Sequence, residues 1–216
     1  MARRYPVHLD VSGRRCLVVG GGAVAWRKAR VLADCGGRVT VVAERFCRPL
    51  RRSRRVERVS RRFRLSDLRG VWLVVAATDD SELNRKVAEA AGRRRVLVNV
   101  VDAPGLGNFI VPAQLVRGRL TVSVSTEGAS PLLARKIRDR LGHQLDETYA
   151  QWLELLAEFR PRAQRRLPSF DARRRFFEQL TSEAVSLIVK EEGLSGGRRY
   201  AWQALRRLAA GAGESS

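Results

Sequence analysis

The sequence contains little of what a disulfide-bonded, metal-binding or membrane-spanning protein needs. It has three cysteines, two histidines and one methionine in 216 residues. The cysteines have no CxxC or Cys/His spacing, so we expect reduced thiols and no metal bound by the protein itself. His8 and His143 are far apart, which argues against a Ser-His-Asp triad. With no apolar run near the roughly 20 residues that span a bilayer and no apolar core in MARRYPVHLDVSG, we expect a cytoplasmic protein without membrane contact.

Lysine is also scarce, whereas arginine is abundant. Only four of the 42 basic residues are lysine, and the formal net charge is +20. Between Glu44 and Gly70 the chain has 11 arginines and three acidic residues. Such a surface attracts nucleic acid, anionic lipid or small molecules with many carboxylates, although arginine preference on a solvated surface explains it equally well. Because the chain lacks zinc-finger, basic-zipper and RNA-recognition signatures, we do not expect a nucleic-acid partner.

Strands and helices alternate in the first hundred residues. Apolar runs predict buried strands at 14–19, 38–43, 71–77 and 96–101, and a more exposed strand at 56–63. Residues with helical spacing follow the strands at 14–19 and 71–77. This order predicts an α/β fold whose parallel sheet has helices on both faces.

The pattern changes after residue 102. FIVPAQLVRGRLTVSVST predicts two β-like pieces around a turn at Arg117-Gly118, and SPLLARKIRDRLGHQL predicts a helix with Pro131 in its first turn. DETYAQWLELLAEF, ARRRFFEQLTSEAVSLIVKEEG and RYAWQALRRLAA then predict helices, the first two punctuated by Pro161 and Pro168. We divide the chain into 1–112, 113–145 and 146–210, followed by a disordered tail at 211–216.

The stretch CLVVGGGAVAWRKA places glycines between a predicted strand and a predicted helix. Gly20 permits a tight turn, and Gly22 lets the backbone approach a pyrophosphate. Ala25 in place of a third glycine still allows the helix to pack closely on the strand. The helix N-terminus offers free N–H groups to phosphates. The segment therefore predicts dinucleotide binding; the alternative is a tight turn that binds nothing.

Two further loops concern the cofactor. An acidic residue after the second strand usually binds the adenosine ribose. Here Glu44 favours NAD, whereas the adjacent Arg45 would suit the 2′-phosphate of NADP, and we lean toward NAD. Thr78 and Asp79 follow a later strand at the edge where a cofactor rests, but they also suit an ordinary helix N-cap.

The apolar run VLVNVV ends on Asp102 and is followed by a Pro/Gly loop. An aspartate before Ala-Pro can cap a turn through its own backbone, and spacing alone favours this interpretation. A carboxylate at a strand end beside a cofactor crevice can also act as a general base. Asn99 and Asn108 flank it and either orient a substrate or satisfy the loop backbone.

Several segments together resemble one family. They are YPVHLDVSGRRCLVVGGGAVAWRKARVL, VVAATDDSELNRKVAEAA, VNVVDAPGLGNFIVPA and LTVSVSTEGASPLLARKIRD. In this order and spacing they resemble the precorrin-2 dehydrogenase/sirohydrochlorin ferrochelatase family, a module also found at the N-terminus of fused siroheme synthases. The match covers roughly residues 5–142. NVVDAP and STEGASPLLARKIR are more specific than the glycine turn.

The resemblance implies a homodimer that oxidises the tetrapyrrole precorrin-2 to sirohydrochlorin with NAD⁺. Some members of the family also insert Fe²⁺ to give sirohaem. The implied architecture is a Rossmann-type domain with a parallel sheet, a central dimerisation region with β-structure and a helical C-terminal domain. Because the methyltransferase half of fused enzymes needs a further long stretch of chain, we expect a stand-alone form.

The resemblance also assigns site residues and favours a catalytic role for Asp102. It implies cofactor contacts at the glycine turn and after the second strand, and tetrapyrrole contacts in the STEGASP segment. Thr126 stands where some relatives carry a serine, so the role of that hydroxyl is open. The implied positions are Ala23, Val24, Glu44 and Arg45 for the cofactor, and Ser125 and Thr126 for the tetrapyrrole.

Two alternative functions belong to other classes. One is a non-catalytic regulatory module that senses NAD through a Rossmann domain. The other is a basic nucleic-acid-binding protein, whose affinity would depend steeply on salt. Neither alternative predicts the NVVDAP and STEGASP segments.

Overall fold

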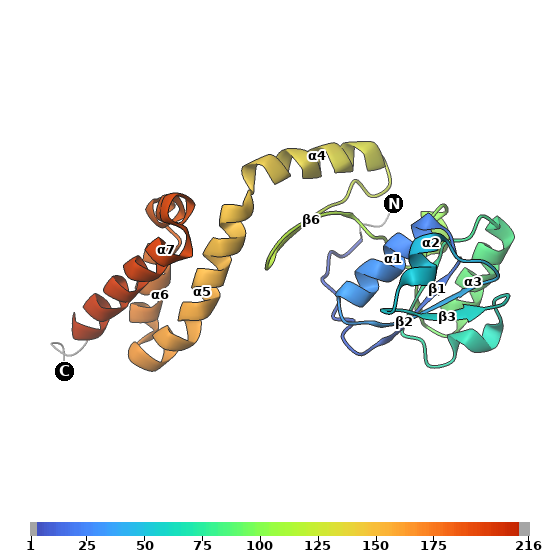
Figure 1. The fold of residues 1–216 in the computed structure, drawn as a ribbon, viewed down its shortest axis with the longest axis horizontal. Coiled ribbons are helices and arrows are strands. Elements are labelled where there is room, and N and C mark those ends of the chain that lie inside the picture. The colour runs from blue at the N-terminus through green and yellow to red at the C-terminus, as the bar shows by residue number, and fades with distance from the viewer. Residues whose placement is uncertain (1–3, 212–216) are drawn as a thin grey trace. The chain divides into compact units, whose positions relative to one another are not determined.

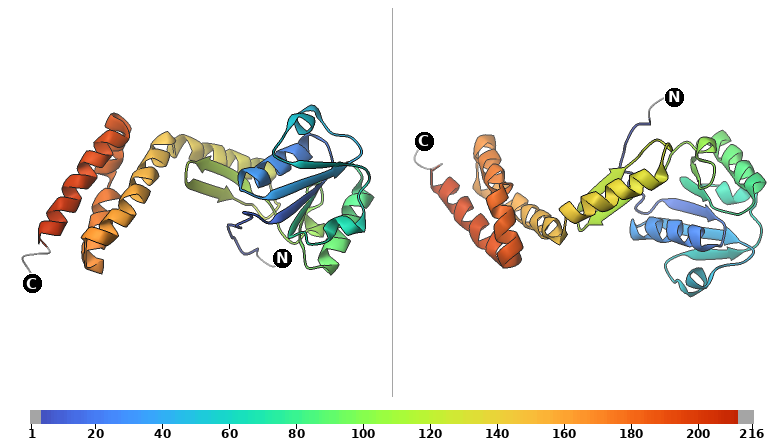
Figure 2. Two further views of the ribbon diagram at one scale, coloured as in Figure 1. Left: turned by 60° about the horizontal axis from the view of Figure 1, so that its bottom comes forward. Right: turned by 90° about the horizontal axis from the view of Figure 1, so that it is seen from above.

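The computed structural model describes residues 4–211, shown as a ribbon in Figures 1 and 2. The chain divides into two compact units, Met1–Val111 and Pro112–Ser216, and each is described by itself. From residue 212 onward the predicted disordered tail lies outside the described residues, and Gly211 ends the last helix. Within 4–211, no helix is both long and apolar enough to cross a membrane.

The first unit is built on a five-stranded sheet whose strands all run parallel, in the order β3-β2-β1-β4-β5. The inner strands are continuous apolar runs because both of their faces are buried. This confirms the predicted α/β class. The strands are β1 (Arg15–Val19), β2 (Arg38–Ala43), β3 (Glu57–Ser60), β4 (Leu73–Ala76) and β5 (Leu97–Val100).

Helices cover both faces of this sheet (Figure 1). Side chains along β1 alternate between the faces: Val18 packs in the cluster that includes α1 (Ala23–Asp34), and Leu17 packs with Val87 of α3 (Ser81–Arg93). Three short elements complete the unit, α2 (Arg48–Arg52) and the 3₁₀ turns η1 (Leu65–Leu68) and η2 (Pro104–Leu106).

The predicted strand at 56–63 is only four residues long. The N–H of Arg61 donates to the carbonyl of Val59 at 3.1 Å, which turns the chain away from the sheet. The Arg61 guanidinium then binds the carboxylate of Asp67 through two hydrogen bonds of 2.9 and 2.6 Å. The sequence pattern did not show this turn because arginine alternation suits an exposed strand equally well.

The second unit begins with the predicted hairpin. Strands β6 (Ala113–Arg117) and β7 (Leu120–Val124) pair antiparallel, and Gly118 takes φ 53° in the turn between them. Helix α4 (Pro131–Gln144) packs on this hairpin with proline in its first turn, as predicted. Its N-cap is Ser130, whose hydroxyl accepts from the N–H of Leu133.

Helix α5 (Glu147–Arg166) runs through Pro161, so the predicted interruption at that proline is wrong. A proline inside a helix costs one backbone hydrogen bond and roughly 3 kcal/mol. Four fully buried apolar side chains at four-residue spacing lie on both sides of the proline and offset that cost by packing into the helical core. They are Leu155, Phe159, Ala163 and Leu167.

The single helix predicted for 172–193 is also wrong. It divides into α6 (Phe170–Leu180) and α7 (Glu183–Gly211), because the Thr181 hydroxyl bonds back to the carbonyl of Phe177 and ends α6. Helix α7 is itself two helices, 183–192 and 194–211, joined at Gly193 with φ 65°. This kink allows both halves to bury apolar residues in one core with α5 and α6 (Figure 2).

Candidate active site

The glycine turn after β1 is shaped by close backbone contacts. Gly20 has φ 123°, and a Cβ there would lie 2.3 Å from the carbonyl oxygen of Ala77. A Cβ on Gly21 would lie 1.8 Å from the carbonyl oxygen of Arg45. A Cβ on Gly22, by contrast, would meet nothing within 4 Å. The first two glycines are therefore needed to build the turn, whereas the third borders open space.

That open space lies at the N-terminus of α1. Ala23 is the first residue of the helix, and Val24 is 38% exposed. No side chain caps the helix and no acidic residue stands in its first turn, so its N–H groups and positive dipole end are unopposed. Ala25 is fully buried against the sheet, as predicted for a small residue at this position. Backbone donors beside open space fit the phosphates of a dinucleotide.

The three thiols are free, and one of them supports this turn. The N–H of Cys47 donates to the carbonyl of Gly21 at 2.7 Å, and its thiol approaches the carbonyl of Gly22 at 3.6 Å. Burial raises the pKa of the Cys16 thiol to about 11, so this thiol stays neutral at physiological pH. In the described part of the chain, no group of three His, Cys, Asp or Glu side chains gathers to hold a metal ion.

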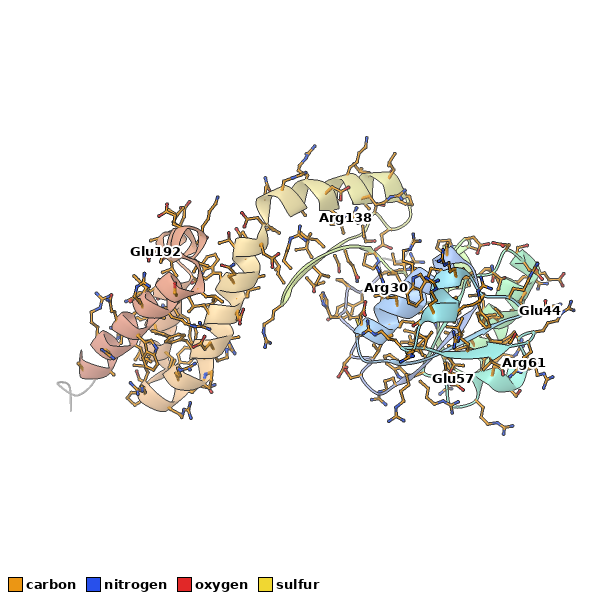
Figure 3. The ribbon with its side chains drawn as sticks, viewed as in Figure 1. Arg30, Glu44, Glu57, Arg61, Arg138 and Glu192 are labelled. Carbon is orange, nitrogen blue, oxygen red and sulfur yellow. The ribbon has the colours of Figure 1, made fainter. Side chains whose placement is uncertain are left out.

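Glu44 and Arg45 follow β2 at the same edge of the sheet. The Glu44 carboxylate accepts a hydrogen bond of 3.0 Å from Nε of Arg62, and both side chains are solvent-exposed, Glu44 by 62% and Arg62 by 87%. Glu44 is labelled in Figure 3. The backbone of Arg45 packs against the glycine turn, as the short distance to Gly21 shows. The Glu44 pair with Arg62 is exposed and does not decide between a ribose hydroxyl and its phosphate, so the preference for NAD over NADP stays a prediction.

The loop after β4 contains Thr78 and Asp79, but the N-cap of α3 is the next residue, Asp80. The Asp80 carboxylate accepts from the N–H of Leu83 at 2.9 Å. Thr78 bonds instead to Asn84, whose Oδ1 accepts from the threonine hydroxyl at 2.7 Å and from its N–H at 3.2 Å. The capping alternative was therefore misplaced by one residue, and the predicted cofactor contacts of Thr78 and Asp79 stay predictions.

Asp102 follows β5 and is held from across the loop. Nδ2 of Asn84 lies 3.2 Å from Oδ1 and 3.5 Å from Oδ2 of Asp102. Both side chains line a cavity of about 410 Å³ between the start of α3 and η2. Its other lining residues are Ser81, Glu82, Arg85, Ala103 and Leu106.

Asn84 and Arg85 were missed by the sequence analysis, although the sequence held a signal for Asn84. The residue stands three positions before Val87 on the apolar stripe of α3, where a polar side chain is unexpected. It is 1% exposed, and it is one of two buried polar residues in the described chain. Arg85 gave no signal, because a lone cation on an exposed helix face is ordinary.

Asn99 and Asn108 bond to the backbone around Asp102. Oδ1 of Asn108 accepts from the N–H of Val98 at 2.8 Å, and its Nδ2 donates to the carbonyl of Val96 at 3.1 Å. Nδ2 of Asn99 donates to the carbonyl of Phe109, whereas its buried Oδ1 has no partner. These bonds support the loop-satisfying alternative for both residues, and a substrate contact stays a prediction.

Ser125 and Thr126 belong to the second unit, in the connection from β7 to α4. The Ser125 hydroxyl accepts from the N–H of Glu127 at 3.1 Å, and the Thr126 hydroxyl accepts from the N–H of Ser130 at 3.1 Å. Thr126 thus supports the residue that caps α4. A threonine can make this bond as well as a serine, so the geometry is compatible with either residue.

Family models match the chain in three consecutive segments. Residues 7–113 match the family described as putative NAD(P)-binding. Residues 117–144 match the central domain of sirohaem biosynthesis proteins, and residues 148–208 match the dimerisation region of sirohaem synthase. The solved structure described as SirC, precorrin-2 dehydrogenase, is 30% identical with a TM-score of 0.79, covering 94% of this chain and 100% of that one. The chain belongs to the precorrin-2 dehydrogenase family of sirohaem biosynthesis.

Longer proteins also contain this module. The siroheme synthase of Methylobacillus flagellatus is 38% identical over 212 residues, which are 97% of this chain and 44% of that protein. The siroheme synthase of Pseudomonas aeruginosa is 42% identical over 208 residues, covering 89% of this chain and 44% of that protein. The chain thus spans less than half the length of these relatives. Membership of the family confirms the resemblance drawn from NVVDAP and STEGASP, and it confirms the NAD(P)-binding domain.

Proposed function

We propose that the chain oxidises precorrin-2 to sirohydrochlorin with NAD⁺ and that Asp102 is the general base. The position of the Asp102 carboxylate, against a cavity at the sheet edge that carries the glycine turn, carries this proposal. Because all strands are parallel, the loops after β1, β4 and β5 share that edge. A hydride acceptor and a proton acceptor at one crevice are what the oxidation requires.

The residues around the glycine turn fit the cofactor. The N–H groups of Ala23 and Val24 would hold its phosphates in the open space beside Gly22, and Glu44 would accept from the adenosine ribose. When bound, NAD⁺ supplies a two-electron acceptor for hydride. Thr78 and Asp79 border the same edge, where their loop would face the cofactor.

The reaction then needs one proton acceptor from the chain. Precorrin-2 loses a hydride and a proton, so the products are sirohydrochlorin, NADH and one proton. Asp102 would accept that proton on a carboxylate oxygen, because it lies two residues after β5 and lines the cavity. Arg85, in the same lining, offers a guanidinium to one of the substrate's carboxylate arms. We retain Ser125 and Thr126 as predicted tetrapyrrole contacts.

The relatives named siroheme synthase support a second step, on the product of the oxidation. Insertion of Fe²⁺ releases two pyrrole N–H protons, and Asp102 could accept them in turn. The tetrapyrrole nitrogens hold the iron, so the protein needs no metal site of its own. Adding Fe²⁺ to the completed oxidation and recording the spectrum of sirohaem tests this step.

We also propose a cytoplasmic homodimer. The match of residues 148–208 to a sirohaem synthase dimerisation region supports the dimer, which sedimentation analysis would test. Three free thiols suit a reducing compartment. The family match does not favour the regulatory or nucleic-acid-binding alternatives, and carboxylate-rich substrates account for part of the basic surface.

The first experiment is an anaerobic assay of the full chain with precorrin-2 and NAD⁺. We expect NADH to appear together with the spectrum of sirohydrochlorin. Asp102→Asn should lower kcat by at least about a hundredfold, since general-base catalysis contributes on that scale, and leave the Kd for NAD⁺ unchanged. Absence of turnover by a folded wild-type protein that binds NAD⁺ would refute the proposed function. Near wild-type activity of Asp102→Asn would refute only the assigned base.

A further inference from the structure

The amide of Asn84 has only one orientation that satisfies its neighbours. Its Oδ1 faces the N–H of Thr78 at 3.2 Å, and its Nδ2 faces the carbonyl oxygen of Thr78 at 2.9 Å. A backbone N–H can only donate and a carbonyl can only accept, so these two contacts decide which end of the amide is which. A flipped amide would place oxygen against oxygen and nitrogen against a donor.

This orientation leaves one hydrogen of Nδ2 unassigned, and it is directed at Asp102. The two distances to the carboxylate, 3.2 and 3.5 Å, are those of one shared donor. Asn84 is 1% exposed, so water does not compete for that donor. The backbone of Asn84 is also held, because its main-chain N–H donates to the carbonyl of Asp80 at 3.0 Å at the start of α3.

We propose that Asn84 is the positioning residue of the active site, because its amide locks the Asp102 carboxylate and the Thr78 loop into one rigid arrangement. This inference rests on the proposed function, in which Asp102 accepts the substrate proton. A single buried side chain bonds to Thr78 in the loop after β4 and to Asp102 in the loop after β5. Asn84 therefore fixes the distance between the cofactor edge and the base, and it acts through Asp102 rather than on the substrate.

Asn84→Asp tests this role with the smallest change of shape. It keeps an acceptor for the Thr78 N–H but replaces the donor by an oxygen that faces both the Thr78 carbonyl and the Asp102 carboxylate and is repelled by them. We expect kcat to fall by at least about tenfold, as a small misplacement of a catalytic group does. KM and Kd for NAD⁺ should change less than kcat, because the backbone donors of the glycine turn have no hydrogen bond to Asn84, whereas the Thr78 loop does. Asn84→Ala should give the same pattern.

Val87→Ala is the matched control for loosening the same helix. Val87 is fully buried one turn further along α3 and does not bond to Asp102. Its variant should lose thermal stability but keep kcat near wild type. If Val87→Ala and the Asn84 variants lose kcat equally, Asn84 has only a structural role and the inference fails.

A double-mutant cycle on stability provides a second readout that needs no substrate. Combining Asn84→Asp with Asp102→Asn removes the repulsion between two carboxylates and provides an amide that can donate to the carboxylate at position 84. The double variant should therefore regain part of the thermal stability that Asn84→Asp loses, but not the bond to the Thr78 carbonyl and not the activity. In the wild-type chain, the Asn84 side-chain amide protons should exchange slowly with solvent and change their NMR shift in Asp102→Asn.

The outcomes separate this inference from the proposed function. An inactive wild type, or an active Asp102→Asn, refutes the function or its base whatever Asn84 does. If Asp102→Asn is inactive while a folded Asn84→Asp keeps kcat within about threefold of wild type, the positioning role alone is wrong. Additive stability losses in the double-mutant cycle would also overturn it, even if the Asn84 single variants were too unstable to assay.

Discussion

The two halves of the sheet's carboxyl edge present polar groups in opposite ways. Beside β4 and β5, the carboxylate of Asp102 is held by the buried amide of Asn84, which also fixes the loop at Thr78. Beside β1 and β2, the edge presents backbone N–H groups at an uncapped helix. The ion pair of Glu44, just after β2, with Arg62 is exposed to solvent. The first half is suited to chemistry that needs a fixed distance, and the second to binding that tolerates adjustment.

The difference follows from what each half must contact. A proton acceptor must be held within a fraction of an ångström of the reacting atom, and buried hydrogen bonds supply that rigidity. Phosphates are bound by several backbone donors and a helix dipole at once, so no single side chain is essential. Substitutions in the second half should therefore act through space and charge rather than through loss of a specific bond.

Gly22→Ala should produce the largest effect on the binding half. Its Cβ meets no protein atom, and φ −81° is accessible to any residue, so the variant should fold normally. The methyl group would occupy the space that the phosphates need, and we expect the Kd for NAD⁺ to rise at least about tenfold, or about 1.4 kcal/mol, by calorimetry. Gly92→Ala, whose Cβ also meets nothing, is the matched control and should bind normally. Unchanged NAD⁺ affinity in Gly22→Ala would mean that the cofactor lies elsewhere.

Local sequence patterns predicted the glycine turn after β1 better than they predicted the hydrogen bonds around Asp102. The turn is recognisable from Gly20 and Gly22 between a strand and a helix, although the close backbone contacts require glycine at positions 20 and 21. Asn84 was missed because its partners stand six and 18 residues away, and only the fold makes them neighbours. The buried position of Asn84 on α3 was readable, but its bond to Asp102 was not.

The helices of the second unit also show that local sequence patterns do not reveal tertiary packing. Pro161 was expected to interrupt a helix because local propensity disfavours it, yet apolar side chains on both of its sides pack into one core. No glycine or proline in the sequence marks the break between α6 and α7. Only Thr181 and Ser182, which suit a helix end and a following cap, marked it in the sequence. Tertiary packing decided both cases.

Arg85→Ala should have an intermediate effect, on the catalytic half. Its side chain lines the cavity beside Asp102 and is half-exposed. It also forms an ion pair with Glu89 at 2.8 Å, which competes with a substrate carboxylate for the guanidinium. If it holds a carboxylate arm of the substrate, KM for precorrin-2 should rise about fivefold, the loss of roughly 1 kcal/mol expected for an exposed ion pair, while kcat stays near wild type. Arg93→Ala, on the exposed surface at the other end of α3, should leave KM unchanged. Equal KM values for the two variants would exclude Arg85 from the substrate site.

Asp67→Asn should have the smallest effect, and on stability alone. Within the arginine-rich stretch, Asp67 is 9% exposed and bonded twice to Arg61, and this guanidinium holds the pKa of the Asp67 carboxyl below its usual value of 3.8. A lowered pKa in the folded state means that the carboxylate stabilises the fold above its unfolded pKa and loses that contribution as the pH falls through the folded one. We expect Asp67→Asn to lower the free energy of unfolding by about 1 kcal/mol at pH 7, as for a charged hydrogen bond, and the difference from wild type to shrink below about pH 4. Glu44→Gln breaks the exposed pair with Arg62 and should leave the urea midpoint at pH 7 unchanged, since exposed pairs contribute little. If both variants lowered the free energy of unfolding equally, burial would not explain a difference in strength between the two ion pairs.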